Sequence, residues 1–186
     1  MLHKPFGYLS QFTNNGPKQG KKKLLGELYG FAKGTMAIGR LDEKSEGILL
    51  LTTDGKMSEL VRSKQVEKEY FAQIDGIIND SALVQLRNGV EIGFNGKKYK
   101  TKPCIVKAIG DPKFEARIQK IRDSKHGPSS WISITLSEGK FRQVRKMTAA
   151  VGFPTLRLIR VRVGGHHLNS LKAGEVSELE SFLLDP

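Results

Sequence analysis

The sequence predicts an α+β fold in which a mixed, largely antiparallel sheet is flanked by short helices. Predicted strands outnumber predicted helices, several strands adjoin through hairpins, and strands and helices do not alternate as βαβ units would require. The longest apolar run, Ile48–Leu51, has the length of a strand, whereas a membrane-spanning helix needs about 20 apolar residues. The chain is long enough to bury one ordinary core, and we expect it to fold as two lobes.

The first half of the chain alternates between polar loops and short apolar segments. Residues 14–23 combine Gly, Pro and Asn with lysines, which predicts a loop. Residues 21–31 carry three leucines and a phenylalanine at helical spacing, which predicts a short amphipathic helix. The other elements predicted here are strands at 35–39 and 48–53, a polar loop between them, and a helix at 54–63.

The second half contains most of the predicted strands. Residues 68–76 alternate, with Tyr70 and two apolar residues on one face, which predicts a strand. A helix N-cap at Asp80 or Ser81 and a stop at Asn88 and Gly89 delimit a helix. The other predicted elements are strands at 89–94, 97–109, 114–121, 131–136 and 155–165, a hairpin turn at 95–96, and a helix at 138–152 ending at Gly152.

Basic residues are concentrated in the second half of the chain. Residues 1–93 hold 13 basic and 11 acidic side chains, whereas residues 94–186 hold 18 basic and 8 acidic ones. A basic surface attracts a polyanion through counterion release, independently of base sequence. From net charge alone, nucleic-acid binding and a soluble protein with a high pI are equally good interpretations. The charge is thus compatible with a nucleic-acid partner and says nothing about chemistry.

Three features could carry chemistry. Asp42 lies in a polar loop joined to two buried strands, where a catalytic carboxylate would be held rigidly, although a lone loop aspartate more often caps a turn. Arg142, Arg145 and Lys146 lie at helical spacing away from an apolar face, which fits phosphate binding, a guanidinium held against a carboxylate, or a solvated helix face. Tyr70 fits either a core residue or a base-stacking residue.

Four segments, in order, resemble the motifs of the ribosomal pseudouridine synthases. HKPFGYLSQFT resembles the Lys-Pro motif that opens these enzymes, and GRLDEKSEGILLLTTDG resembles their catalytic-aspartate motif. KEY is similar to their tyrosine motif, and EGKFRQVRKMTAAVGFPTLRLIRVRVG to their arginine-containing motif. The match spans residues 2–164, in the order expected for the branch that acts on single ribosomal sites. Within it, SQFT, PSSWISITLSEG and GFPTLRLIR look most like a large-subunit enzyme that lacks the small N-terminal S4 RNA-binding domain.

The chain departs from the family pattern at three places. Phe141 stands where the family usually has a polar residue, and Lys146 where arginine is common, so we expect both positions to tolerate change. Only three residues precede Lys4, where the family has a further strand.

The resemblance implies that the chain isomerises one uridine of 23S ribosomal RNA to pseudouridine, with the target base flipped out. Asp42 would be the catalytic carboxylate, Arg145 would orient it and keep it charged, and Tyr70 would stack on the uracil. It leaves open whether Asp42 attacks C6 or C1′ or whether a base removes the C2′ proton. The residues expected to contact RNA are Lys4, Arg40, Lys68, Lys97, Lys98, Lys140, Arg142, Gln143, Lys146 and Arg160.

The reaction consumes nothing, so we expect neither a cofactor nor a metal. The sequence has no phosphate-binding Gly-rich loop and no metal-ligand spacing, its single Cys104 cannot form an internal disulfide, and we expect His166 and His167 to be surface residues. The expectation is one catalytic domain over residues 1–186, in two lobes around an RNA-binding cleft and without an S4 domain.

We further expect a cytoplasmic bacterial monomer without membrane contact, whose partner is the 23S RNA or an assembly intermediate of the large subunit. The alternatives are a non-catalytic RNA-binding module and a synthase for a small-subunit or transfer-RNA uridine. The presence of Asp42, Tyr70 and Arg145 together favours an enzyme over a module.

Overall fold

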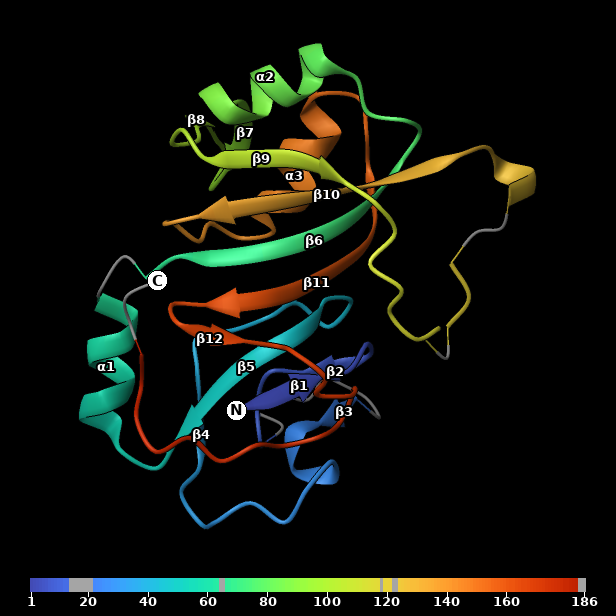
Figure 1. The fold of residues 1–186 in the computed structure, drawn as a ribbon. Coiled ribbons are helices and arrows are strands. Elements are labelled where there is room, and N and C mark those ends of the chain that lie inside the picture. Colours follow the sequence, from blue (N-terminus) through green and yellow to red (C-terminus); the bar gives the residue numbers. More distant parts are fainter. Residues whose placement is uncertain (14–21, 64–65, 118, 122–123, 184–186) are drawn as a thin grey trace. The chain divides into compact units, whose positions relative to one another are not determined.

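The computed structural model describes residues 1–13, 22–63, 66–117, 119–121 and 124–183 (Figure 1). The chain divides into two compact units, which are described separately. The first unit consists of residues 1–66 and 159–186, and the second of residues 67–158. The expected loop at 14–23 lies largely outside the described residues.

The sheet of the first unit is built around strand β5. Strands β1 and β4 pair with β5 in antiparallel fashion, and β11 pairs with it in parallel, with Ile159 opposite Glu46. Leu2, Leu25 and Leu49 are fully buried together in the core of this unit. Its elements are β1 (Leu2–Lys4), β2 (Tyr8–Leu9), β3 (Lys23–Leu24), η1 (Leu25–Glu27), β4 (Met36–Ile38), β5 (Glu46–Thr52), α1 (Gly55–Ser63), the end of β11 (Thr155–Val163) and β12 (His166–His167).

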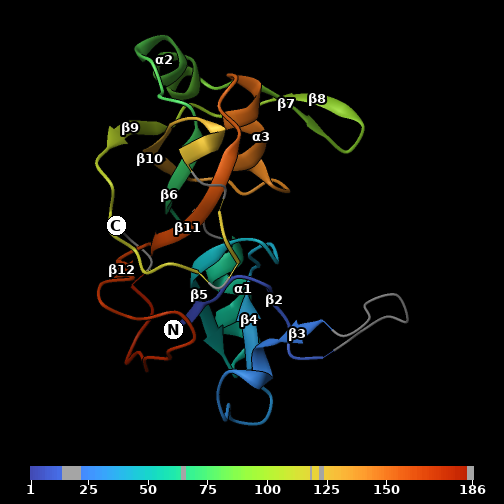
Figure 2. The same ribbon diagram turned by 90° about the vertical axis from the view of Figure 1, so that its right-hand side faces the viewer.

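The second unit has a sheet in which β6, β10 and β9 lie side by side in that order (Figures 1 and 2). Strand β10 is antiparallel to both neighbours, with Tyr70 opposite Ile134. The core lies between this sheet and the helices, and includes the fully buried Ile132 and Met147. Its elements are β6 (Lys68–Asp75), α2 (Asp80–Asn88), β7 (Glu91–Phe94), β8 (Lys97–Lys100), β9 (Ile105–Ile109), η2 (Ser124–His126), β10 (Ser129–Leu136), α3 (Gln143–Ala150) and the start of β11.

The predicted fold class is confirmed, because a mixed sheet with mostly antiparallel pairs carries a few short helices. The hairpin turn at Asn95 and Gly96 is also confirmed, since both residues adopt the positive φ angles, 49° and 73°, that such a turn requires. The N-cap of α2 is Asn79 instead of Asp80 or Ser81, and its side chain accepts a hydrogen bond from Ala82 N at 2.9 Å.

Two predicted elements are wrong, and the single strand expected at 97–109 is divided into β8, which pairs with β7, and β9, which pairs with β10. The helix expected at 21–31 is a short strand followed by one 3-10 turn, because Lys23 and Leu24 pair in extended conformation with β2 and Gly26 lowers helix propensity. In place of the strand expected at 114–121, the described residues form an irregular segment. Its Phe114 ring packs near Phe71 and Trp131, with centroids 6.2 and 6.4 Å away, so side-chain packing replaces strand pairing.

Gly47 allows β5 and β11 to approach closely. Its φ is +105°, and a Cβ atom built there would lie 2.2 Å from the carbonyl oxygen of Arg160 and 2.5 Å from its nitrogen. Any side chain at this position would separate the two strands that position the loop before β5.

We therefore predict that Gly47→Ala lowers the free energy of unfolding by at least about 3 kcal/mol, because it combines an unfavourable φ with overlap against backbone atoms. Gly55→Ala is the matched control: it lies in α1, and nothing lies within 4 Å of an added Cβ. Urea unfolding of both variants measures the difference. Equal stability of the two would contradict the close approach.

Candidate active site

The loop between β4 and β5 carries Arg40 and Asp42. Strand β4 ends at Ile38, and the next residue, Gly39, turns the chain with a φ of +71°. Ser45 N donates a hydrogen bond to Asp42 O at 3.0 Å before β5 begins. Asp42 is half-buried and Arg40 is exposed. The loop thus presents a carboxylate from a short turn between two paired strands.

The segment after β1 fixes this loop through hydrogen bonds to the loop backbone, two from the Ser10 hydroxyl and one from a backbone amide. Ser10 Oγ donates to Leu41 O at 2.8 Å, and Leu41 N donates to Ser10 Oγ at 2.9 Å. Gly7 N donates to Glu43 O at 2.8 Å. The residues on both sides of Asp42 are therefore bonded to the N-terminal segment, and two motifs that are about 30 residues apart in sequence meet.

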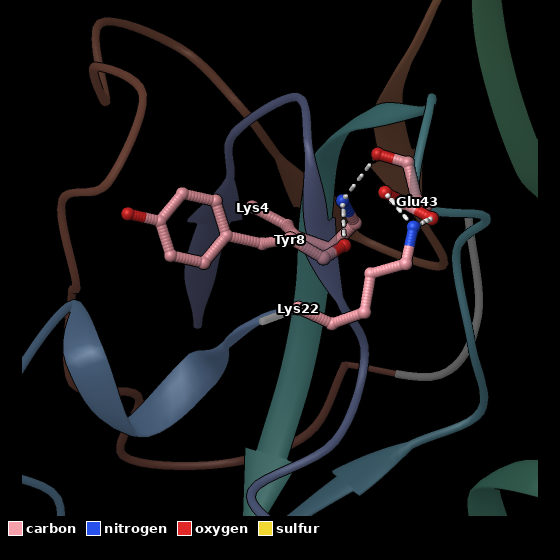
Figure 3. Close-up of polar contacts among 4 residues, drawn as sticks. All are labelled: Lys4, Tyr8, Lys22 and Glu43. Carbon is pink, nitrogen blue, oxygen red and sulfur yellow. Dashed lines mark hydrogen bonds and ion pairs between the residues drawn. The ribbon is translucent and has the colours of Figure 1, made fainter. Parts of the chain in front are cut away.

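Lys4 is fully buried below the same loop (Figure 3). Its ammonium donates to the carbonyl oxygens of Tyr8 at 2.7 Å, Pro5 at 2.9 Å and Glu43 at 3.4 Å. Burial lowers the pKa of Lys4 to about 7, while the charges of Glu46, Asp42 and Glu43 act in the opposite direction. A buried cation thus interacts favourably with the Asp42 carboxylate and bonds to the loop backbone.

Glu43 connects the loop to a second lysine. Its carboxylate accepts hydrogen bonds from Lys22 Nζ at 2.9 and 3.0 Å, while its backbone carbonyl faces Lys4 (Figure 3). The Lys22 pair is partly exposed, so by itself it adds little stability. The loop is held by main-chain contacts more than by this ion pair.

Arg160 is also buried, at 5% exposure, on β11. Its Nε donates to Ile48 O at 2.8 Å, within the pair of strands that Gly47 allows to approach. Its guanidinium thus bonds to backbone inside the first unit.

Tyr70 lies in β6 of the second unit, half-buried against the core. Neighbouring positions are fixed by the pairing with β10, across which Ser133 Oγ donates to Glu69 Oε1 at 2.6 Å. Lys68, two residues before Tyr70, is half-buried. A rigid central strand thus holds the tyrosine.

Arg145 lies in α3 and is half-buried, with Nη1 donating to Thr155 O at 3.3 Å. The helix begins at Gln143. Arg142 therefore precedes the first helical residue and does not lie on a helical face. Arg142 is instead the N-cap, with a left-handed φ of +53°, so the predicted helical row of three cations is wrong. Only Arg145 and Lys146 lie on α3.

The residues expected to contact RNA differ in exposure. Lys4, Gln143 and Arg160 are buried at 0%, 4% and 5% exposure, with polar atoms bonded inside the protein, which corrects their expected surface role. Their types gave no warning, because lysine, glutamine and arginine are usually exposed. The exposed candidates are Arg40, Lys97, Lys98 and Arg142, and the half-buried ones are Lys68, Lys140 and Lys146.

Sequence reasoning missed the residues that fix the loop. Ser10 and the main chain of Glu43 do this by contacts between residues more than 30 positions apart, which no spacing rule reveals. Lys4 was the one residue that could have indicated these contacts. A lysine between apolar neighbours needs hydrogen-bond acceptors inside the protein if it is buried.

His166 corrects the expected surface pair. It is buried at 6% exposure and its Nε2 accepts a hydrogen bond from Leu183 N at 2.9 Å, whereas His167 is exposed. Among the described residues, no group of three or more His, Cys, Asp or Glu side chains could hold a metal ion. No helix in the described part of the chain is long and apolar enough to cross a membrane.

Comparison with known proteins gives one family. A model of the family described as RNA pseudouridylate synthase matches residues 1–150, which include Asp42, Tyr70 and Arg145. The chain is 40% identical over 181 residues to ribosomal large subunit pseudouridine synthase E of Vibrio vulnificus, covering 96% of this chain and 74% of that protein.

Further relatives agree with this result. The protein of the same name from Xanthomonas axonopodis pv. citri is 40% identical over 92% of this chain and 88% of its own length. Ribosomal large subunit pseudouridine synthase B of Escherichia coli (strain K12) is 34% identical over 78% of this chain and 45% of its own. A solved structure described as a pseudouridylate synthase has a TM-score of 0.71 and 26% identity; the match covers 94% of this chain but 66% of that one.

The buried lysine generates a stability prediction. Lys4→Met removes the ammonium and leaves buried carbonyl oxygens without their donor, so we expect the free energy of unfolding to fall by about 1–3 kcal/mol or more at pH 7. Lys33→Met, at an exposed position, is the control and should change little.

The same variant tests the pKa. Between pH 7 and 10.5 an unfolded lysine keeps the proton that folded Lys4 loses, so the stability of the wild-type protein rises with pH relative to Lys4→Met. The free energy of unfolding should rise by at most about 1.4 kcal/mol per pH unit, which corresponds to a tenfold change in the unfolding equilibrium constant. Urea unfolding at pH 7 and pH 9 measures it, and a difference that does not change with pH would rule out the lowered pKa.

Proposed function

This chain belongs to the RNA pseudouridylate synthase family, and from that premise we propose that it isomerises one specific uridine of 23S ribosomal RNA, with Asp42 as the catalytic carboxylate. The reaction breaks the N1–C1′ bond of the uridine, rotates the uracil and forms a C5–C1′ bond. No atom is gained or lost, so the protein supplies a reactive carboxylate and a binding site for the flipped base.

The observation that carries the proposal is the fixed loop around Asp42 within a segment that matches the family. A catalytic group must be held to within a fraction of an ångström, and hydrogen bonds from Ser10 and Gly7 restrain the residues on either side. The buried Lys4 adds a further restraint, because its Nζ donates to the carbonyl oxygen of Glu43, the residue after Asp42, at 3.4 Å. These contacts support a catalytic role over that of a turn-capping aspartate.

Tyr70 and Arg145 are proposed as the other catalytic residues. Tyr70 would stack on the flipped uracil, and its position on a central strand supports this because a stacking surface must be rigid. Arg145 would hold Asp42 in its reactive orientation through the two-pronged geometry of a guanidinium. Arg40, exposed in the same loop as Asp42, would help to displace the target base.

The RNA-contacting surface is proposed from the exposed and half-buried cations. It consists of Arg40, Lys68, Lys97, Lys98, Lys140, Arg142 and Lys146. Lys4, Gln143 and Arg160 are left out because their polar atoms bond inside the protein. The substrate would be the 23S RNA or an assembly intermediate of the large subunit, met by a monomeric enzyme in the bacterial cytoplasm.

Asp42→Asn should abolish pseudouridine formation, with a fall of at least about 1000-fold, because an amide cannot act as nucleophile or base. Affinity for an RNA fragment carrying the target should stay within about twofold, since the side chain keeps its size and the cations proposed to contact RNA are unchanged. Asp54→Asn, an exposed aspartate after β5, is the control for loss of one negative charge. Turnover is measured by pseudouridine mapping. Continued pseudouridine formation by Asp42→Asn would refute the assignment.

Arg145→Lys keeps the positive charge but removes the planar pair of donors. We expect activity to fall at least about tenfold, with RNA affinity preserved, because a point charge cannot orient a carboxylate in two directions. Single-turnover rates at saturating enzyme measure the effect. A near-normal rate would mean that Arg145 acts through charge alone.

A further inference from the structure

The second unit carries an exposed aromatic residue among cations. Phe141 exposes 66% of its surface, more than any other large apolar residue among those described. It lies in the turn before α3, next to the exposed Arg142. Lys146 Nζ lies 5.3 Å from the centroid of its ring. A ring left in water beside cations is not explained by packing.

The turn is attached to the β7–β8 hairpin by two lysines. Lys146 Nζ also donates to Gly93 O at 2.6 Å in β7. Lys140 Nζ lies 5.3 Å from the ring centroid of Phe94 and 5.0 Å from that of Tyr99. Phe141 therefore lies beside a hairpin and is not on a freely moving loop.

Glu138 fixes the backbone that presents Phe141. It accepts hydrogen bonds from Tyr99 Oη at 2.5 Å, Lys102 N at 3.0 Å and Gln143 Nε2 at 2.6 Å. The buried Gln143 in turn accepts from Lys140 N at 2.9 Å. Both ends of the turn are thereby held, which gives Phe141 and Arg142 defined positions.

The chain from the β7–β8 hairpin onward is rich in lysine. Residues 94–110 contain five lysines and no acidic residue, Glu91 in β7 is paired with Lys98 at 2.8 Å, and Glu138 already accepts hydrogen bonds from three donors. A flat apolar ring with surrounding cations matches a nucleobase and its phosphates, because every base has a face that stacks and every nucleotide a charge that cations neutralise.

We propose that an unpaired nucleotide of the RNA substrate, distinct from the uridine that is isomerised, stacks on Phe141 while Arg142 and Lys97 contact its flanking phosphates. This inference rests on the proposed function, since it assigns a further contact of the same RNA. The affinity for the RNA substrate would then depend on the Phe141 ring, in contrast to the expectation that this position tolerates change.

The test measures binding of a 23S RNA fragment that carries the target uridine. Phe141→Ala should weaken binding at least about tenfold, without changing the dependence of affinity on salt, because stacking involves no counterion release. Phe141→Tyr should restore binding, since it keeps the ring. Ile105→Ala is the matched control, because Ile105 is 64% exposed in β9 of the same unit and lies outside the turn. Lys97→Gln should reduce the salt dependence.

The stacked nucleotide is identified by RNAs with single abasic sites at unpaired positions. One abasic site should weaken binding to the wild-type protein and cause no further loss in Phe141→Ala. Saturating RNA should restore the turnover of that variant, since the contact binds and does not react. Equal binding by Phe141→Ala, or a change in its oligomeric state that accounts for the loss, would overturn the inference. If the wild-type protein forms no pseudouridine, the proposed function fails instead, and the two results are distinguishable.

Discussion

A lysine ammonium without solvent contact holds the loop around Asp42. The three donors of Lys4 are satisfied by carbonyl oxygens of residues 5, 8 and 43, so the start of the chain and the loop before β5 share one hydrogen-bonded centre. Burying a charge is unfavourable unless it is paired and bonded, and here nearby carboxylates and carbonyls provide both. The position of the proposed catalytic carboxylate depends on this arrangement.

The first unit combines this centre with an unusually close pair of strands. Gly47 lets β5 meet the backbone of Arg160, whose guanidinium bonds to Ile48 O in the same place. The loop therefore leads directly into a strand that has little freedom to shift. Rigid strands behind a short polar loop are a recurrent way to hold a reactive group without placing it on a mobile segment.

The second unit uses a carboxylate in the same way. Glu138 accepts hydrogen bonds from one side-chain hydroxyl, one backbone amide and one side-chain amide. These bonds join the β7–β8 hairpin to the turn before α3. In each unit a buried or half-buried ionic group orders backbone that carries exposed cations. The exposed groups can then meet a polyanion with little further loss of conformational freedom.

From the amino-acid sequence one can predict the fold class, most strands, the helices α1 and α2, the hairpin at 95–96 and the family motifs, because these depend on local periodicity, on turn residues and on residue order. Packing of the folded chain settled which charged and polar side chains stay exposed. Lys4, Gln143 and Arg160 belong to residue types that are usually exposed, yet each is buried with its polar atoms hydrogen-bonded inside the protein. It also made Arg142 the N-cap of α3, with a left-handed φ of +53°, where the residue spacing predicted a helical position. Lys4 bonds to Glu43, 39 positions later, and Arg160 to Ile48, 112 positions earlier, and no local pattern encodes contacts over such separations.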